Sequence, residues 1–420
     1  MQLSKKVFID RLLGRLLCFI LIPFVRLIGI LLRRDHSIHD GNTRCIAVAK
    51  YYGLGSIIHA TPMLRALKQT YPEARVIFLT RQANQDLFAH LVDVDEVLFV
   101  EDRTFLKFLS SNFRICLTLI MRRVDLFFDL ELFSAYGALV SLSSLARNRI
   151  GFFCGKDTDF KTWIYTHLIY FNFQMPVRFC YLQLARVANV SQDVSTELTT
   201  LIIPDELREA ARSKLNAIVK HRGNGLIAIN VNASELSLER RWLPERFAEV
   251  IRHFSSQNYT LLLVGSRGEQ AYAQQVAEMA GEVGERVHNV AGEFVFSEFL
   301  ALLQECDALL TNDSGIMNFG YALHVPTLSL FGPCHPAQYH IPSNMTRYLY
   351  QPVFCSPCVH LLYEAPCKGR AYCMAQIETS AVITQLEALL RGTVFELDAP
   401  LMPSILLSTD SSVLGLLRAK

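Results

Sequence analysis

The regular alternation of short apolar runs with amphipathic segments is the feature that most constrains how this chain can fold. In the second half, runs typical of buried strands are separated by segments with the apolar period of a helix. The strand-like runs span 226–231, 260–264, 287–290, 308–311 and 327–331, and the helical segments span 244–254, 269–280, 297–305 and 315–323. Strands that alternate with helices form parallel sheets covered on both faces. The sequence therefore predicts an α/β, doubly wound fold.

The first half repeats this rhythm, with a helical segment at 57–70 and strand-like runs at 45–49, 75–80, 96–100 and 124–130. Because 420 residues exceed the roughly 100–200 of an ordinary domain, we expect two Rossmann-like domains that face one cleft. The boundary is expected near 204–225. After an N-terminal head, the predicted divisions are a first Rossmann-like domain, a second one, a cysteine-rich loop, and a C-terminal helix with its tail, at 45–205, 222–345, 351–376 and 377–420.

The head, residues 1–34, is basic and apolar. It holds seven Lys or Arg side chains and one acid, whereas the rest of the chain holds 34 basic and 38 acidic residues. Its longest charge-free stretch, 16–25, is shorter than the roughly 20 residues of a spanning helix. We expect a helix in the headgroup plane, which Pro23 breaks in two. A tilted spanning helix, with Arg26 reaching the interface, and a buried helix remain alternatives, and the pattern disfavours a cleaved signal peptide.

The acidic body is a poor candidate for binding nucleic acid, which requires a basic face. Three loops that follow predicted strands instead have the glycines and hydroxyls that bring backbone amides close to an anion. In open parallel sheets, ligands bind beyond the carboxyl ends of the strands. The loops are Gly53-Leu54-Gly55-Ser56, Gly265-Ser266-Arg267-Gly268-Glu269 and Asn312-Asp313-Ser314-Gly315. They predict a phosphorylated ligand, although tight strand-to-helix turns use the same residues.

These motifs resemble glycosyltransferase family 9, the heptosyltransferase-like glycosyltransferases. The likeness spans about 45–340 and rests on four blocks: KYYGLGSIIHATPMLRAL at 50–67, ERRWLPERFAEV at 239–250, LLLVGSRGE at 261–269 and TNDSGIMNFGYALHVPTLSLFG at 311–332. It implies a two-domain GT-B fold and an inverting, metal-independent sugar transfer, with no catalytic cofactor, from a nucleotide diphosphate sugar. The usual acceptor in such a family is a lipid-linked saccharide, such as a lipopolysaccharide core.

The resemblance also implies roles for single residues. Arg240 and Arg241 match the family's basic pair before Trp242, so Arg240 is expected at the diphosphate, with the amides of Ser314 and Gly315. Asp313 is expected at the donor sugar or the reacting centre. The other expected donor-side and phosphate-binding positions are Gly53, Gly55, Gly265, Glu269, Asn312 and Asn318.

Each of these residues also has an ordinary structural explanation. The arginine pair can cap the helix that begins at Pro244, and Glu269 can interact with the dipole of its own helix. Asp313 can simply make its turn. Trp242 is expected in the core rather than against a nucleotide.

Two departures from the family pattern affect the proton transfer. Ser56 stands where the family has the aspartate expected as general base, and Asn318 stands where it usually has a histidine. Serine cannot take a proton unaided near neutral pH, and asparagine cannot hold a charge. His59, one helical turn after Ser56, is a candidate base, and Asp129 and Glu131, at a strand end, are further candidates.

The eleven cysteines are mostly single and set in apolar runs, which is typical of reduced, buried thiols in a cytosolic body. Four of the eleven, Cys355, Cys358, Cys367 and Cys373, are closely spaced and predict a structural zinc site, with His360 as a spare ligand. A reduced loop, or disulfides in an oxidising compartment, are the alternatives.

Together these features predict a glycosyltransferase at the cytoplasmic face of the inner membrane, attached peripherally or by a single pass. It would move a heptose-like sugar from a nucleotide diphosphate sugar to a lipid-linked or surface saccharide. One alternative is a catalytically degenerate member that binds a nucleotide sugar or glycan without turnover. Another is an epimerase of GT-B form, which would act on a free nucleotide sugar and need no lipid acceptor.

Overall fold

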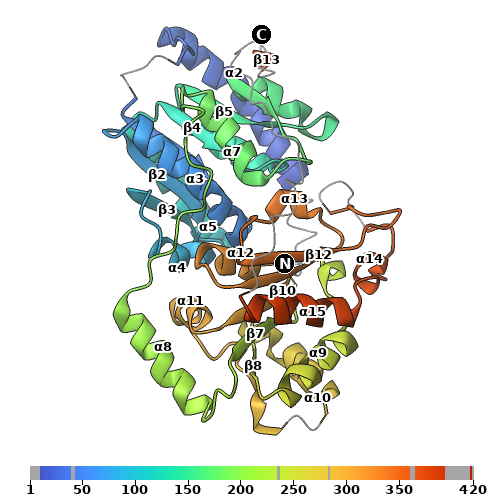
Figure 1. Ribbon diagram of the computed structural model, residues 1–420. Coiled ribbons are helices and arrows are strands. Elements are labelled where there is room, and N and C mark those ends of the chain that lie inside the picture. The colour runs from blue at the N-terminus through green and yellow to red at the C-terminus, as the bar shows by residue number, and fades with distance from the viewer. Residues whose placement is uncertain are drawn as a thin grey trace. The chain divides into compact units, whose positions relative to one another are not determined.

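The computed structural model describes residues 10–38, 43–233, 237–281, 284–359, 365–392 and 417–418 (Figure 1). They form two compact units, each built on a sheet whose strands alternate with helices. The first unit holds the described residues up to Thr199, together with Leu417 and Arg418. The second unit holds those from Thr200 to Gly392. The α/β alternation expected from the sequence is confirmed.

The sheet of the first unit has the strand order β13-β6-β5-β4-β1-β2-β3. Its strands are β1 (Cys45–Ala49), β2 (Arg75–Arg81), β3 (Glu96–Val100), β4 (Leu126–Asp129), β5 (Asn148–Phe153), β6 (His167–Tyr170) and β13 (Leu417–Arg418). All pairs are parallel except β13 with β6. The direction of winding reverses between β1 and β4, so a crevice is expected where the carboxyl ends of these two strands meet.

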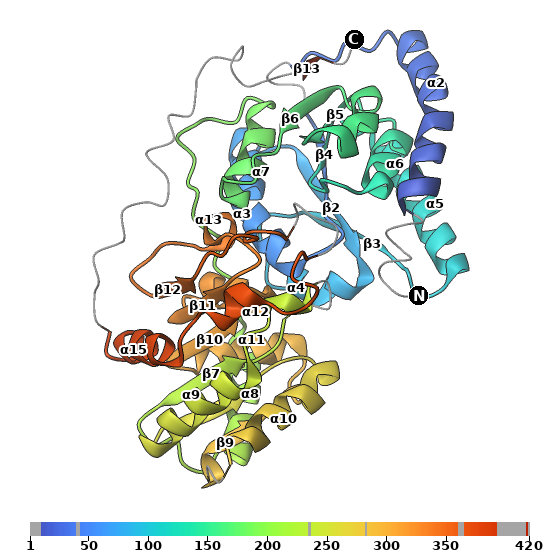
Figure 2. The ribbon, with the colours of Figure 1, turned by 90° about the vertical axis from the view of Figure 1, so that its right-hand side faces the viewer.

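Helices cover both faces of this sheet (Figure 2). The helices of the unit are α2 (Arg15–Leu31), α3 (Leu54–Thr70), α4 (Gln85–Phe88), α5 (Phe105–Arg122), α6 (Ala135–Ser143) and α7 (Val177–Arg186), with a π-helical turn η1 (Asp10–Gly14) and 3-10 segments η2 (Gln82–Asn84) and η3 (Lys156–Trp163). Helices α3 and α7 pack together on one face, and α2, α5 and α6 lie on the other. The apolar core between α5, α6 and the central strands includes Ile115, Leu119 and Val140.

The head forms one continuous helix rather than two. Helix α2 runs through Pro23 to Leu31, so the expected break is wrong. Pro23 lies on the exposed side of the helix, where the carbonyl that loses its amide partner can be hydrated. By length and composition, the described helix Leu12–Leu31 could cross a membrane. One side of it, however, is packed on the first unit, with Cys18 and Val25 buried in a cluster shared with α6.

The sheet of the second unit has the order β12-β11-β10-β7-β8-β9, and all its pairs are parallel. Its strands are β7 (Leu226–Asn230), β8 (Thr260–Leu263), β9 (Val287–Asn289), β10 (Ala308–Asn312), β11 (Thr327–Phe331) and β12 (Thr346–Tyr350). Strand β12 continues this sheet beyond the predicted domain end at residue 345. The chain passes between the units at Thr199–Thr200, just before the boundary expected at 204–225.

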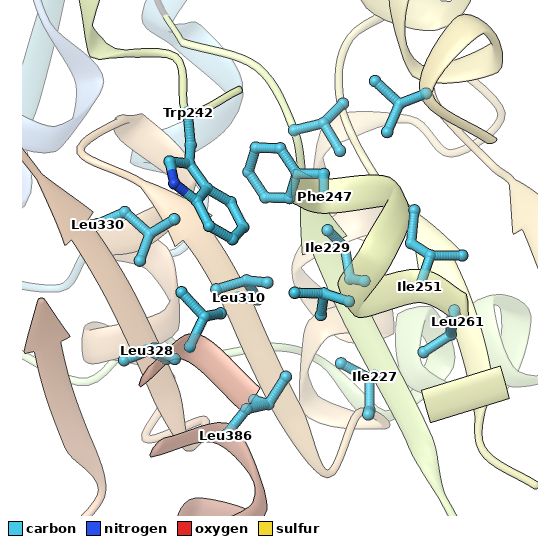
Figure 3. Close-up of a cluster of buried hydrophobic side chains, with 14 of the residues drawn as sticks. Ile227, Ile229, Trp242, Phe247, Ile251, Leu261, Leu310, Leu328, Leu330 and Leu386 are labelled. Carbon is cyan, nitrogen blue, oxygen red and sulfur yellow. The ribbon is translucent and has the colours of Figure 1, made fainter. Parts of the chain in front are cut away.

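The helices of the second unit are α8 (Asp205–Ile218), α9 (Pro244–Ser256), α10 (Gln270–Met279), α11 (Phe296–Gln304), α12 (Gly315–Ala322), α13 (Pro336–Tyr339), α14 (Tyr372–Ala375) and α15 (Thr379–Leu390), with 3-10 turns η4 (Leu238–Arg240), η5 (Arg267–Glu269) and η6 (Gly284–Arg286). Trp242 lies in the core between the sheet and α9, beside Phe247 (Figure 3). It is 0% exposed, and its indole Nε1 donates to the carbonyl of Ile377 at 3.1 Å. The expectation that Trp242 is a core residue is confirmed.

Candidate functional site

The carboxyl ends of β7, β10 and β11 bring polar side chains together at one edge of the second unit. Asn230 ends β7, Asp313 follows β10 and Cys334 follows β11 closely. The three strands are neighbours in the sheet. Asn230 donates from Nδ2 to Thr311 Oγ1 at 3.1 Å and to Ser314 Oγ at 2.9 Å. These bonds tie the end of β7 to the turn that begins α12.

Asn312 connects this edge to the arginine pair. Its Oδ1 accepts a 3.0 Å hydrogen bond from the amide of Trp242, and its Nδ2 donates to the carbonyl of Asn232 at 3.0 Å. Both polar atoms of the side chain are therefore used to hold the loop that carries Arg240 and Arg241. The structure gives Asn312 a positioning role, whereas the sequence suggested donor contact.

Arg240 and Asp313 form a largely buried ion pair at this edge. Arg240 Nη1 lies 3.5 Å from Asp313 Oδ2, and the two side chains are 13% and 5% exposed. Burial is the largest single influence on the pKa of Arg240 and lowers it, but the Asp313 carboxylate and the neighbouring Cys334, Tyr339 and Cys358 together raise the pKa above its usual value, so the guanidinium stays charged. The Cys334 thiol lies beside both groups, and burial and the Asp313 charge raise its pKa well above the usual value. Asp313 therefore does more than shape its turn, because it orients the cation expected at the diphosphate.

The amino end of α12 is built like an anion-binding site. Ser314 is extended and makes no side-chain cap to its own helix. No atom would contact a Cβ on Gly315, so the space beside this residue is open. Free amides at a helix start, together with the positive end of the dipole, favour a negative group there. Asn318 Nδ2 donates to the carbonyl of Ser314 at 3.0 Å, which makes Asn318 a support of this turn.

The glycine loop after β8 is held by a capping box. The Ser266 amide donates to Glu269 Oε2 at 2.6 Å, and the Ser266 side chain accepts from the helix in return. A Cβ on Gly265 would lie 3.1 Å from the same carboxylate oxygen, so glycine allows this close approach. One oxygen of Glu269 thus serves its own helix. A role of Glu269 in donor binding remains a prediction.

The two arginines of the basic pair point to different partners. Arg240 faces Asp313, whereas the guanidinium of Arg241 stacks 4.4 Å from the ring centre of Tyr272 on α10. The geometry therefore separates their roles. Arg240 lies with the polar residues at the start of α12, and Arg241 lies beside α10, which follows the β8 loop.

The first unit presents a different edge at the carboxyl ends of β1 and β4. Glu131 Oε1 accepts from the amides of Tyr51 and Tyr52 at 2.7 and 3.0 Å, and its Oε2 lies 2.9 Å from Lys50 Nζ. Glu131 therefore fixes the loop that leads to Gly53. With φ of 84°, Gly53 has a backbone conformation that favours glycine.

The candidate bases of the first unit are buried or bound to other side chains. Ser56 hydrogen-bonds with the Tyr181 hydroxyl, and His59 is fully buried in α3. Asp129 is fully buried, accepts from the Tyr165 hydroxyl and lies 3.4 Å from Lys161 Nζ. Burial raises the pKa of Asp129, and Lys161 and Tyr165 oppose the change. This geometry gives Asp129 a structural role, and no observation assigns the base.

The structure thus brings part of the expected set together. Around the start of α12 it places Arg240, Asn312, Asp313, Ser314, Gly315 and Asn318. Gly265 and Glu269 lie in the loop after β8, and Arg241 stacks on Tyr272 near the start of α10. Gly53, Gly55, Ser56 and His59 belong to the first unit.

Sequence reasoning missed several residues of these edges, namely Asn230, Cys334, Lys50, Lys161 and Tyr181. A signal existed for Asn230 and Lys50, because both stand at the carboxyl end of a predicted strand. Lys161 comes from a 3-10 segment with no apolar period, so only the fold could bring it to Asp129.

The cysteine-rich segment packs on the loop that follows β11. The amide of Cys358 donates to the carbonyl of Pro333 at 2.8 Å, and Ser356 Oγ donates to that of Gly332. All eleven cysteines of the chain are free. Burial and the neighbouring Cys355 and Cys367 raise the pKa of Cys358.

Within the described ranges, no three His, Cys, Asp or Glu side chains are arranged to hold a metal ion, and this includes the four cysteines. His360 lies outside those ranges. The zinc site stays a prediction, to be tested by measuring the metal content of the protein.

Comparison with known proteins finds relatives among the heptosyltransferases. A lipooligosaccharide heptosyltransferase 2 of Campylobacter jejuni is 25% identical over 179 residues, which cover 42% of this chain and 55% of that protein. Lipopolysaccharide heptosyltransferase 2 of Escherichia coli K12 is 31% identical over 104 residues, 24% of this chain and 30% of its relative. The chain therefore matches about half or less of the length of these relatives.

Two solved structures share the fold. The glycosyltransferase family 9 protein of Veillonella parvula has a TM-score of 0.67 at 20% identity, over 85% of this chain and 99% of that one. The E. coli ADP-heptose LPS heptosyltransferase II has a TM-score of 0.66 at 19% identity, over 83% and 99%. The fold is thus of the GT-B class, with two doubly wound Rossmann-like units and an N-terminal apolar helix.

A family model described as glycosyltransferase family 9 (heptosyltransferase) matches residues 134–367. This range begins after β4, includes the whole α12 edge and ends in the cysteine-rich segment. It covers more than half of the 420 residues. The chain belongs to glycosyltransferase family 9.

Proposed function

We propose that this protein is an inverting, metal-independent glycosyltransferase that moves a heptose-like sugar from a nucleotide diphosphate sugar to a lipid-linked saccharide of the lipopolysaccharide type. The Arg240–Asp313 ion pair at the amino end of α12 carries the proposal. Relatives of the chain are named lipopolysaccharide and lipooligosaccharide heptosyltransferases, and a structure with the same fold is named for ADP-heptose. ADP-heptose is therefore the first donor to test.

The proposed chemistry matches the charges of the second unit. In the transfer, the bond between the anomeric carbon and the diphosphate oxygen breaks, and the acceptor oxygen bonds to the opposite face of that carbon. Negative charge then develops on the departing diphosphate, and cations and fixed amides stabilise it. Arg240 supplies the cation, and Ser314 and Gly315 supply amides at the positive end of α12. Asp313 pairs with Arg240, and a contact between the Asp313 carboxylate and the donor sugar is part of the proposal.

We also propose that the protein acts at the cytoplasmic face of the inner membrane. The support is the apolar, basic head, whose helix α2 exposes most of its large apolar side chains. A lipid-linked acceptor would reach the enzyme at that surface. The free state of all eleven cysteines agrees with a reducing compartment.

A second candidate function is binding of a nucleotide sugar or glycan without turnover. It is favoured by the edge of the first unit, where Ser56 replaces the expected aspartate and bonds with Tyr181. The nearby carboxylates of Asp129 and Glu131 are held by Lys161 and Lys50. A proton acceptor for the saccharide hydroxyl would have to be freed from such contacts.

One experiment separates the two functions. The full-length protein is incubated with ADP-heptose and other nucleotide diphosphate sugars, with and without a deacylated lipopolysaccharide core. Release of nucleoside diphosphate that depends on the acceptor supports transfer, and its persistence in a chelator supports metal independence. The anomeric configuration of the product, read by NMR, tests inversion. Donor binding in calorimetry without any release supports the binding function, and the absence of both binding and release overturns both candidates.

A further inference from the structure

Two helices of the first unit expose apolar side chains on the same side of its sheet. Helices α2 and α5 both pack against α6, which lies between them. On α2, Cys18 Sγ donates to the carbonyl of Ala135 at 3.7 Å. On α5, Asn112 Oδ1 accepts from the Tyr136 hydroxyl at 2.7 Å. Figure 2 shows α2 and α5 on this side, with α6 next to them.

Helix α2 is fixed to the unit along its length. Near its start, Arg15 donates to the carbonyl of Asp157 at 2.7 Å, and past its middle, Arg26 stacks on Trp163. After its end, Arg34 donates to the carbonyls of Leu145 and Ala146. A helix held at both ends and in between by a water-facing domain cannot cross a bilayer in this arrangement. It presents one side to its surroundings instead.

That outer side of α2 is apolar. The exposed large side chains of the head are Leu12, Leu13, Leu16, Leu17, Phe19, Ile20, Phe24, Leu27, Ile30, Leu31 and Leu32. A soluble domain that packs a helix on its surface normally turns polar residues outward. The inverted pattern is typical of a helix whose outer face lies in lipid.

Helix α5 likewise exposes apolar side chains. The sequence alone does not show this, because α5 lies in the middle of a domain. Its inner side, with Ile115 and Leu119, joins the core of the unit. At about 100° per residue, its exposed apolar side chains occupy a sector about 160° wide on the opposite side of the helix. They are Phe105, Leu106, Leu109, Phe113, Leu117, Ile120 and Met121, and Phe113 is 73% exposed.

The helices that carry these faces are basic, although Glu101 pairs with Lys107 and Arg114, and Glu96 with Arg122, beside α5. The stretches 11–34 and 103–123 each contain five Lys or Arg residues and no acid. Beside the apolar face of α5, Arg114 pairs with Glu101 at 3.4 Å yet keeps 70% of its side chain exposed. Basic residues at the border of an apolar face are the pattern that binds anionic lipid headgroups. A second protein copy with the same basic borders would be repelled by this charge.

We propose that the exposed faces of α2 and α5 form a two-helix docking surface for an anionic phospholipid bilayer, with both helices in the plane of the membrane. Attachment is then monotopic, and α5 is a second membrane-inserting element in the middle of the domain. The inference deepens the proposed function, since it sets how the enzyme meets a lipid-linked acceptor, but its test does not need turnover.

The test is flotation of the full-length protein with vesicles of phosphatidylethanolamine and phosphatidylglycerol, with phosphatidylcholine vesicles as the zwitterionic comparison. Because binding depends on the apolar area inserted, the double variant F113D/M121D should weaken binding to the anionic vesicles by about tenfold or more. The matched control is Met279→Asp, an exposed methionine on α10 in the second unit. It should bind like the parent protein, and all three proteins should bind less to phosphatidylcholine.

A second readout uses the two tryptophans of the chain. With Trp242→Phe, Trp163 beside α2 remains as the reporter, and brominated lipids should quench its fluorescence. With Trp163→Phe, the buried Trp242 should not be quenched. Unchanged vesicle binding by F113D/M121D overturns the proposal and leaves α2 alone as the attachment. A change from oligomer to monomer in light scattering, with unchanged vesicle binding, also overturns it and assigns the surface to a second copy.

Failure of this proposal can be told apart from failure of the proposed function. Transfer to a deacylated, water-soluble acceptor should be the same for the parent protein and F113D/M121D. If neither protein shows turnover, the proposed function fails, while the vesicle result still decides the docking surface.

Discussion

The two units contain similar sheets but differ in the charged side chains at the carboxyl ends of their strands. In the second unit, a single ion pair, Arg240–Asp313, stands beside open space at Gly315 and the free start of α12. In the first unit, the strand ends hold ion pairs that satisfy one another: Lys50–Glu131, Arg81–Asp102 and Lys161–Asp129. The arrangement in the second unit leaves charge available to a ligand, whereas the ion pairs of the first unit stabilise its structure. In the proposed function, the edge of the second unit is the donor side, and the edge of the first unit is the acceptor side, where Ser56 stands in place of the expected aspartate.

Burial explains why the two edges should respond differently to mutation. Lys161 and Asp129 are both 0% exposed, and removal of one partner from such a pair leaves an unpaired charge in the interior. Arg240 and Asp313 lie nearer the surface of their unit, where water or a ligand can replace a lost partner. Stability should therefore depend on the first pair and activity on the second.

The largest expected effect is on the stability of the first unit. Lys161→Met should lower its free energy of unfolding by about 3–5 kcal/mol, because Asp129 then loses its cation. The measurement is urea unfolding followed by a probe in the first unit. The double variant D129N/K161M should recover part of the loss, since it buries no unpaired charge. Equal stability of K161M and the parent protein would contradict the conclusion that the buried Lys161–Asp129 pair stabilises the first unit.

The next effect is on activity and belongs to the second unit. Arg240→Ala should reduce kcat/KM for donor turnover by about 10²–10³, the usual effect of losing one group that stabilises developing charge. Arg241→Ala is the matched control and should cost less, because Arg241 stacks on Tyr272. Steady-state release of nucleoside diphosphate gives both values. A larger loss for Arg241→Ala would reverse the roles assigned to the pair.

A smaller effect is expected at Ser56 in the first unit. Loss of a true general base typically costs about 10²–10⁴ in rate. Ser56→Ala removes only a hydroxyl that bonds with Tyr181, so kcat should fall by less than about tenfold. The pH profile of kcat should keep its shape. A loss as large as that of a base would show that Ser56 belongs to a proton relay, and the two edges would then both be catalytic.

The smallest effect concerns a surface network of the second unit. The hydrogen bond from Arg212, helped by Arg222, holds the pKa of Glu305 below its usual value of 4.5. A carboxylate with a lowered folded pKa adds stability above its unfolded pKa and loses it as the pH falls through the folded value. Glu305→Gln should therefore cost no more than about 1 kcal/mol at pH 7 and nothing near pH 2. Thermal unfolding of both proteins at several pH values measures this difference, and a cost that persists in acid would contradict it.

The sequence predicted the fold well where buried strands are continuous apolar runs. β1, β3 and β11 begin and end where the pattern placed them. β5, β6 and β12 were not predicted. Polar residues begin β5 and β6, leaving each with a short apolar run, and Arg347 interrupts β12, which is partly exposed. Pro23 was expected to break the head, but its position on the outer face of α2 allows the helix to continue.

The candidate site was predictable only in part, because residue types show which groups are present but not what already binds them. The sequence placed Arg240, Asp313 and Ser314 on donor-side loops, and the structure brings them together. The sequence could not show that both polar atoms of the Asn312 side chain are hydrogen-bonded within the protein, or that His59 is buried. The outward face of α5 also depends on the fold, since its inner and outer sides are both apolar.

The contact between the head and α6 bears on which acceptors the enzyme can reach. The carboxylate of Asp10 accepts from the amides of Ala135 and Tyr136 at the start of α6, and a Cβ on Gly14 would lie 2.8 Å from that of Ala135. An anchor on a loose linker would let its domain rise and fall above the lipid, and so serve saccharides of many lengths. With α2 in the lipid as proposed, the contact between the head and the start of α6 would hold the carboxyl end of β4, a few residues away, at one height above the bilayer. The length of the saccharide above the bilayer, as well as its chemistry, would then select the acceptor.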